Sequence, residues 1–311
     1  MELKLVKPNI MKHSEYHQFY LGILLQNDSY IYEVYNKQIG IMYDTYTNKL
    51  SSMFDEEYNN YSDTGLLIEG FILGKTYNLL EYNMPNEVIN IFIEHLENKF
   101  YIKYTGDLYY IPKKHENKHV WSDIYIIGYS NDVFYAVGKT PNSCFEKYEI
   151  SFEDIIESIK KRYDSNFYSE FTYSLEIDFY KCRENTKYDV NIEKIYQKIH
   201  DYLNPIKRIR YLLGVDIYKQ ILSNWMRFGI DKNQLLYIYD RMCLMQTRLI
   251  YLNKFSYIAN KIENQYRKLV SRFSLLLSQK NPREIMDGII RLIEEEKKVL
   301  SLVLDELDKS F

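Results

Sequence analysis

Residues Trp121–Tyr129 read WSDIYIIGY, and residues Val133–Val137 read VFYAV. The segment Ser130-Asn131-Asp132 separates these two runs. Ile124–Tyr129 within the first run and Val133–Val137 are rich in β-branched and aromatic side chains, and Ser, Asn and Asp favour turns between strands. The pattern therefore predicts two neighbouring antiparallel strands joined by a tight turn.

Similar runs extend this hairpin in both directions. Phe100–Tyr104 and Leu108–Ile111 lie upstream, on either side of Thr105-Gly106-Asp107, and are rich in Ile, Tyr and Phe. Together with the hairpin they predict an antiparallel β-meander. Phe171–Tyr180, further along the chain, predicts another strand.

Helices are expected around these strands. Glu15–Gln26 and Pro85–Glu97 precede the meander, and Phe152–Arg162 follows it. Ser151 is a suitable N-cap for the last of these, because its hydroxyl can accept from the first free N–H groups and acidic residues follow in the first turn.

From about Asn191 onward the apolar residues recur with the period of a helix. One helix is predicted across the middle of this region, and another after Asn281-Pro282, where Pro suits the first turn. Helices with short connections indicate a bundle. The buried stripes are expected at Leu235, Ile238, Met242, Met245, Leu249 and Leu252, and at Ile285, Ile289, Ile293, Leu300, Leu304 and Leu307.

The change of period defines the expected organisation. The fold class is predicted to be α+β, with an α+β domain over residues 1–185 that contains an antiparallel sheet and an α-helical bundle domain over residues 186–311.

Composition narrows the setting of the protein. Hydrophobic residues make up 46% of the chain and charged residues 27%, which is typical of a globular protein. The three cysteines have no metal-type or disulfide-framework spacing. The chain shows neither a signal peptide nor about 18 consecutive apolar residues. These features predict a cytoplasmic protein without a membrane partner.

Charge is distributed unevenly along the chain. Residues 1–200 have a balance of −9 and residues 201–311 a balance of +6, and the span Lys207–Arg272 holds 13 basic and 4 acidic residues. Solvated outer faces of helices explain such a span most simply. The alternatives are an acidic protein partner or nucleic acid, although no nucleic-acid recognition module is present and the N-terminal part is acidic.

Motifs for common chemistry are absent from the sequence. It has no phosphate-binding glycine-rich loop, no dinucleotide fingerprint, no zinc-protease motif and no nucleophile elbow. His115 and His119 lie in a highly charged loop, so a metal site is not expected there. No cofactor is predicted.

One set of motifs is more specific. Trp121–Tyr129, Val133–Val137 and Tyr148–Phe152, preceded by Gly106–Pro112, resemble the second half of a papain-like domain. The chain is most similar in this respect to the papain-like family of butirosin biosynthesis protein H-type acyltransferases. Gly214–Tyr218 and the helix at Tyr239–Leu252 resemble the helical region that some of these proteins append.

The resemblance implies positions for a catalytic triad. Ser122 stands where the family has His, Gly138 stands at about the position of Asp, and Tyr16 stands at or near the position of the Cys nucleophile. Such chemistry needs a thiolate, a His to activate it and a group that orients the His. Since no cysteine precedes Cys144, the implied protein is a catalytically degenerate member.

A rearranged site is the alternative. His17 and Asp123 are candidates for an acid–base pair, with Ser14 or Ser122 as the nucleophile. Strand alternation argues against it, because Asp123 and Ser122 should point to opposite faces of the sheet. Cys144, which follows Pro141-Asn142-Ser143 in a predicted turn, is not expected to be a nucleophile.

The resemblance therefore implies a binding or accessory component of bacterial peptide or aminoglycoside-type natural-product biosynthesis. An old active-site cleft would present Tyr16, His17, Tyr20 and Ser122 to a ligand, and an acidic acyl- or peptidyl-carrier protein would be the partner. The alternatives are an acyltransferase or amide-forming enzyme that acts on carrier-protein thioesters, and a nucleic-acid-binding protein.

Overall fold

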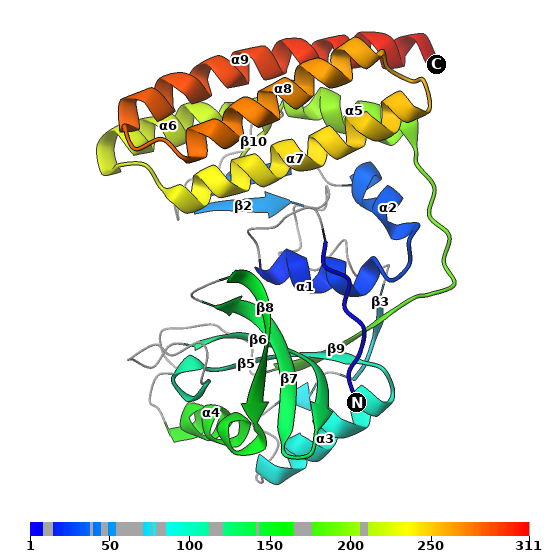
Figure 1. Ribbon diagram of the computed structural model, residues 1–311, viewed down its shortest axis with the longest axis vertical. Helices are drawn as coiled ribbons and strands as arrows, with labels where there is room; N and C mark the ends of the chain where they lie inside the picture. The colour runs from blue at the N-terminus through cyan, green and yellow to red at the C-terminus, as the bar shows by residue number, and fades with distance from the viewer. Residues whose placement is uncertain are drawn as a thin grey trace. The chain divides into compact units, whose positions relative to one another are not determined.

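A computed structural model describes residues 1–8, 15–37, 40–44, 49–53, 71–75, 77–78, 85–111, 121–140, 143–164, 176–205 and 211–310 (Figure 1). The fold class is α+β, as predicted. Two compact units are present: unit 1 comprises Met1–Asp28 and Leu67–Thr186, and unit 2 comprises Ser29–Leu66 and Lys187–Phe311. The expected domains, 1–185 and 186–311, were each continuous in sequence. In the structure Ser29–Leu66 belongs to unit 2 instead of unit 1.

In the described part of unit 1, seven strands form one antiparallel sheet. The order is β3-β9-β5-β6-β7-β8, and β4 pairs with β9 beside β3. Strands β5, β6 and β7 contain three of the predicted meander runs, and β8 adds a strand that was not predicted. The strands are β3 (Phe71–Leu73), β4 (Tyr77–Asn78), β5 (Tyr101–Asp107), β6 (Trp121–Ser130), β7 (Val133–Thr140), β8 (Ser143–Ser151) and β9 (Glu176–Cys182).

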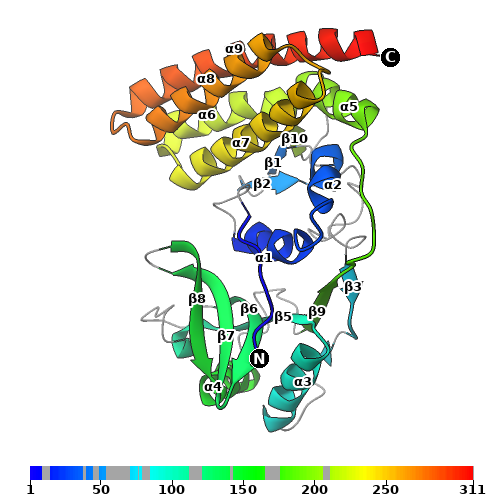
Figure 2. The ribbon, with the colours of Figure 1, turned by 45° about the vertical axis from the view of Figure 1, so that its right-hand side comes forward.

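The two faces of this sheet are covered by different helices. Helices α3 (Pro85–Glu97) and α4 (Phe152–Asp164) lie on one side and α1 (Glu15–Leu24) on the other (Figures 1 and 2). Even-numbered residues of β5, of β7 and of β6 as far as Ile126 face α3 and α4, because Tyr104, Ile124 and Phe134 share one buried core with both helices. Odd-numbered residues of β5 and of the same part of β6 face α1, and a bulge between Ile126 and Gly128 reverses the alternation in the rest of β6.

Local signals account for most of these boundaries. The predicted N-cap is confirmed, since the Ser151 hydroxyl accepts from the N–H of Asp154 at 3.0 Å. The predicted strand Leu108–Ile111 is wrong: Leu108–Tyr110 form a 3-10 turn, because the Asp107 carboxylate accepts from the Tyr109 N–H at 3.1 Å and caps it. Cys144 belongs to β8 rather than to a turn.

The N-terminal segment ties α1 to the sheet. The Leu3 N–H donates to the Ile127 carbonyl (2.8 Å), and the Val6 N–H donates to the Gly22 carbonyl in α1 (3.0 Å). Gly128 permits this approach, since a Cβ there would lie 2.5 Å from the Met1 carbonyl oxygen. The segment thus bridges β6 and α1 and helps to fix α1 on its face of the sheet.

Unit 2 is predominantly helical. The described part contains α2 (Tyr30–Lys37), α5 (Ile192–Leu203), α6 (Ile217–Phe228), α7 (Lys232–Lys254), α8 (Asn260–Leu277), α9 (Pro282–Leu307) and a small sheet of order β10-β1-β2, formed by Tyr211–Leu213, Gly40–Asp44 and Lys49–Met53. The predicted stripe of α7 is confirmed, because all six of its apolar residues are buried. Pro282 opens α9 as predicted, and the Asn281 side chain caps it.

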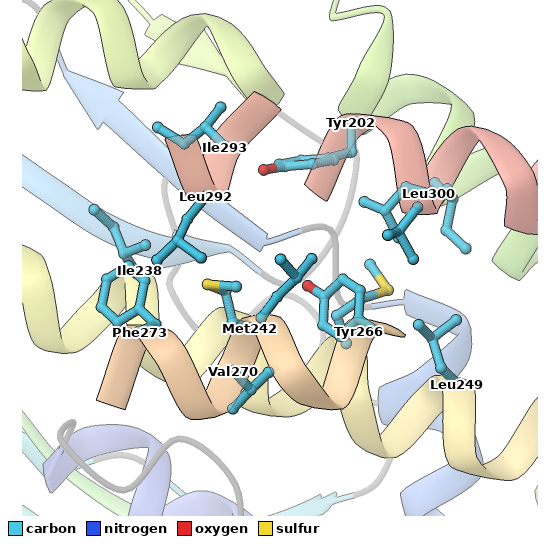
Figure 3. Close-up of a cluster of buried hydrophobic side chains, with 14 of the residues drawn as sticks. Tyr202, Ile238, Met242, Leu249, Tyr266, Val270, Phe273, Leu292, Ile293 and Leu300 are labelled. Atoms are coloured by element: carbon cyan, nitrogen blue, oxygen red, sulfur yellow. The ribbon is translucent and has the colours of Figure 1, made fainter. Parts of the chain in front are cut away.

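A buried polar group lies inside this bundle. Arg241 of α7 donates from Nη2 to both carboxylate oxygens of Glu296 in α9, at 2.5 and 2.6 Å. The hydroxyls of Tyr202 (2.8 Å) and Tyr266 also donate to Glu296. Figure 3 shows Tyr202 and Tyr266 among the apolar side chains of the core. Burial raises the pKa of both tyrosines well above its ordinary value, and the Glu296 carboxylate adds to the effect.

Removal of the buried carboxylate charge should destabilise unit 2. The substitution Glu296→Gln leaves the Arg241 guanidinium buried without its counter-charge, and we expect a loss of about 3–5 kcal/mol in the free energy of unfolding. Glu295→Gln is the matched control, because the Glu295–Arg272 pair is exposed and should contribute about 1 kcal/mol or less. Urea unfolding followed by the fluorescence of the buried Trp225, in a Trp121→Phe background, measures both values. Equal losses in the two variants would contradict the role given to the buried pair.

Candidate functional site

The α1-facing side of the sheet carries a group of charged side chains. Lys103 of β5 lies between two carboxylates, with its Nζ 3.5 Å from Asp178 of β9 and 3.8 Å from Asp123 of β6. The Thr105 hydroxyl donates to Asp123 at 3.0 Å. The side chains of Lys103, Asp123 and Asp178 retain 18%, 30% and 25% of their exposure. We call Lys103, Thr105, Asp123 and Asp178 the β-face cluster.

Strand pairing explains why these four residues meet. Lys103 pairs with Asp178 across β5 and β9, and Thr105 pairs with Asp123 across β5 and β6. Directly opposed residues of antiparallel strands project on the same face of a sheet. Lys103 thereby offsets the repulsion between two carboxylates that three adjacent strands bring together.

Aromatic rings fill the space beside the β-face cluster. Phe19 of α1 stacks on Tyr125 of β6 with ring centroids 4.4 Å apart, and Tyr20 meets Tyr180 of β9 edge-on at 4.9 Å. Phe71 packs edge-on against both Tyr20 and Tyr180. All five side chains are buried. We call Phe19, Tyr20, Phe71, Tyr125 and Tyr180 the aromatic layer.

The hydroxyls of the two tyrosines Tyr20 and Tyr180 form a hydrogen bond within the aromatic layer. The Tyr20 hydroxyl donates to the Tyr180 hydroxyl at 3.1 Å. Burial, together with the nearby Asp178 carboxylate, raises the pKa of Tyr180. Tyr180 is therefore a neutral hydrogen-bonding group over the ordinary pH range, and it joins the aromatic layer to the β-face cluster.

The residues predicted for the site do not all meet. Ser122 pairs with Gly106, and a Cβ on Gly106 would lie 3.1 Å from the Ser158 hydroxyl of α4. Ser122 therefore lies on the α3/α4 face, opposite to α1. Gly138 follows the alternation of Phe134 and Ala136 and belongs to the same face. Asp123 is on the α1 face, as strand alternation predicted relative to Ser122.

The remaining predicted residues belong to α1 and its flank. Tyr20 is part of the aromatic layer, where it is fully buried. Tyr16 and His17 belong to α1 by their backbone, but their side chains lie outside the described part of the structure. Ser14 lies outside the described residues altogether.

The Cys182 thiol is not placed for nucleophilic chemistry. Cys182 of β9 is buried, its sulfur lies 3.7 Å from the Leu24 carbonyl oxygen, and burial raises the pKa of its thiol. A thiol of raised pKa is a poor nucleophile near neutral pH. Nor do the described residues bring together three His, Cys, Asp or Glu side chains that could hold a metal ion.

Sequence reasoning missed Lys103, Asp178 and Tyr180. All three lie in the predicted strands Phe100–Tyr104 and Phe171–Tyr180, but they come together only because β9 pairs with β5 across 75 residues of chain. Alternation of charged residues in strands that are otherwise apolar was the available signal, since a charge on a buried strand usually has a partner.

Comparison with known proteins adds no assignment. No family model and no curated protein matches the chain. Separately, no helix in the described ranges has both the length and the apolar character needed to cross a membrane.

Loss of the shared ammonium should weaken unit 1. The substitution Lys103→Met removes the positive charge that Asp123 and Asp178 share, and we expect a loss of about 1 kcal/mol in the free energy of unfolding at neutral pH. Lys147→Met removes an exposed partner of Glu2 and should change stability by no more than about 0.5 kcal/mol.

Calorimetric unfolding of both variants checks this expectation. Asp178→Asn in the Lys103→Met background should restore part of the loss, since it removes one of the two repelling charges. Fully additive effects of these two substitutions would show that the β-face cluster is not electrostatically coupled.

Proposed function

We propose that this protein is a catalytically degenerate relative of papain-like acyltransferases that acts as a binding or accessory component. Papain-like chemistry requires a thiolate on the helix that faces the sheet. Helix α1 contains no cysteine, and its described sheet-facing side chains, Phe19 and Tyr20, are buried in the aromatic layer. This packing is the observation that carries the proposal.

The β-face cluster suits binding better than turnover. Lys103 is held by two carboxylates, and Asp123 also accepts from Thr105. Groups that are mutually neutralised offer charge and hydrogen bonds to a ligand, but they lack an activated nucleophile. Their partial exposure leaves them accessible to a polar ligand.

The biosynthetic setting comes from the resemblance of the strand motifs. Proteins of the family that the chain resembles accompany bacterial peptide and aminoglycoside-type natural-product assembly. In such a setting the protein would hold a substrate or a partner rather than transfer an acyl group.

A rearranged acyltransferase is the second candidate. The observation in its favour is that Asp123 is on the α1 face, where a base on α1 such as His17 would need an orienting carboxylate. Ser122 cannot be the nucleophile of that site, because it projects from the opposite face of the sheet.

An acidic carrier protein is the proposed partner. The span Lys207–Arg272 contributes less surface charge than its composition suggests, since Arg241 and Arg248 are buried and Arg267 and Arg272 pair with Glu263 and Glu295. Besides Arg267 and Arg272, six described basic residues of the span are exposed: Lys219, Arg227, Lys232, Lys254, Lys261 and Lys268. They supply long-range attraction for an acidic surface.

Incubation with acyl-pantetheine thioesters tests the central proposal. We expect no change in the intact protein mass and no thiol release above buffer, because the α1 face lacks an activated nucleophile. A stoichiometric, hydroxylamine-labile adduct would favour the rearranged acyltransferase. The variant with Cys144, Cys182 and Cys243 all changed to Ser is the control, since it separates adventitious thiol acylation from transfer to a hydroxyl.

Binding to a panel of holo acyl- and peptidyl-carrier proteins tests the partner. We expect at least one complex whose affinity falls about tenfold or more between about 50 and 300 mM NaCl, because exposed charges are screened over a shorter distance at high salt. Lys261→Glu with Lys268→Glu should weaken it, whereas Lys309→Glu, at the end of α9, should not. A complex insensitive to salt, or no complex, would count against an acidic carrier protein.

A further inference from the structure

One end of the helical bundle exposes large apolar side chains. Phe228, Met226 and Leu275 are 83%, 69% and 66% exposed, which makes them the most exposed large hydrophobic residues in the described part of the chain. Exposed apolar groups that gather in one place are a common mark of an interaction surface.

Chain topology brings these residues to the same end. Phe228 is the last residue of α6, and Gly229–Asp231 lead directly to the start of α7. Helices α7 and α8 run antiparallel, so the end of α8, with Leu275, lies at the start of α7 (Figures 1 and 2). We call the α6–α7 and α8–α9 turns, with their flanking residues, the bundle tip. Gly229 has φ +89°, and a Cβ there would meet nothing within 4 Å, so the turn stands in open space.

Charges of both signs surround these apolar residues. The exposed cations of the bundle tip are Arg227, Lys232, Lys280 and Arg283, and the exposed acids are Asp231, Glu284 and Asp287. Among the described residues none of the four cations forms an ion pair, unlike Arg267, Arg272 and Lys297 elsewhere in the bundle.

We propose that the bundle tip is the contact surface of a symmetric dimer of this chain. A two-fold interface is self-complementary: each patch meets its own copy, so a mixed rim can set the cations of one copy against the acids of the other. A uniformly acidic protein or an anionic lipid surface would instead be repelled by the negative charges of Asp231, Glu284 and Asp287. The dimer contact does not rest on the proposed accessory function, and Lys219, Lys254, Lys261 and Lys268, which are not among the cations of the bundle tip, stay available to an acidic partner.

Sedimentation equilibrium of the full chain tests the dimer. We expect a concentration-dependent species of twice the 37.7 kDa chain mass, with a Kd on the order of 1–100 µM, since three apolar side chains make a patch smaller than the ~800 Å² per partner of a stable interface. Phe228→Ser with Leu275→Ser should raise the Kd at least about tenfold. Phe255→Ser, which changes a 52% exposed Phe at the other end of α7, should leave the Kd unchanged.

A charge exchange tests the two-fold arrangement. The variant Arg227→Glu with Lys280→Glu has an acidic rim, and the variant Glu284→Lys with Asp287→Lys has a basic rim. We expect each to be more monomeric than the unmodified chain and the two to associate when mixed. A monomer at about 200 µM, or a dimer that persists in Phe228→Ser with Leu275→Ser, would overturn the proposal. So would a dimer lost in Phe255→Ser alone, or mixed charge variants that stay apart.

Discussion

The position of α1 on one face of the sheet is the constraint on which the account of unit 1 depends. Phe19 stacks on Tyr125 at 4.4 Å, and strand alternation then assigns every neighbouring residue to a face. Asp123 and Lys103 lie towards α1, whereas Ser122 lies towards α3 and α4. A shift of one residue in β6 would exchange these assignments and reverse the chemistry available next to α1.

The same packing stabilises unit 1 and fills the space between α1 and the sheet with rings. Fully buried rings that stack or meet edge-on contribute beyond their buried area, and Tyr20 and Tyr180 satisfy each other's hydroxyls inside the layer. Unit 2 uses a different device, in which Glu296 accepts from Arg241 and two tyrosines at the centre of an apolar bundle. Both arrangements bind polar groups to other parts of the protein, whereas the side chains of the β-face cluster remain partly exposed.

Local sequence signals predicted many of the elements, although not α2, β1, β2 or β8, and long-range contacts decided which side chains meet at the site. The meander, the Ser151 cap and the α7 stripe follow from residue spacing within a few turns of chain. The face of Ser122 does not, because it depends on which side of the sheet α1 covers. Lys103 and Asp178 meet only through the pairing of β5 with β9, and the inclusion of Ser29–Leu66 in unit 2 likewise depends on contacts distant in sequence. The basic residues of Lys207–Arg272 suggested a charged surface. Arg241 and Arg248 are nevertheless buried, which the sequence could not show because burial depends on how the helices pack.

The most direct test of the central claim is a double-mutant cycle between Phe19→Leu and Tyr125→Leu, read as the free energy of unfolding of unit 1. If α1 covers the odd-numbered face, the two substitutions should couple by about 0.5–1.5 kcal/mol. The matched cycle of Phe19→Leu with Phe134→Leu, whose ring packs on the α3/α4 face beside Phe92, should be additive. Coupling to Phe134 and none to Tyr125 would place α1 on the other face of the sheet, the face of Ser122, and would contradict the aromatic layer described for unit 1.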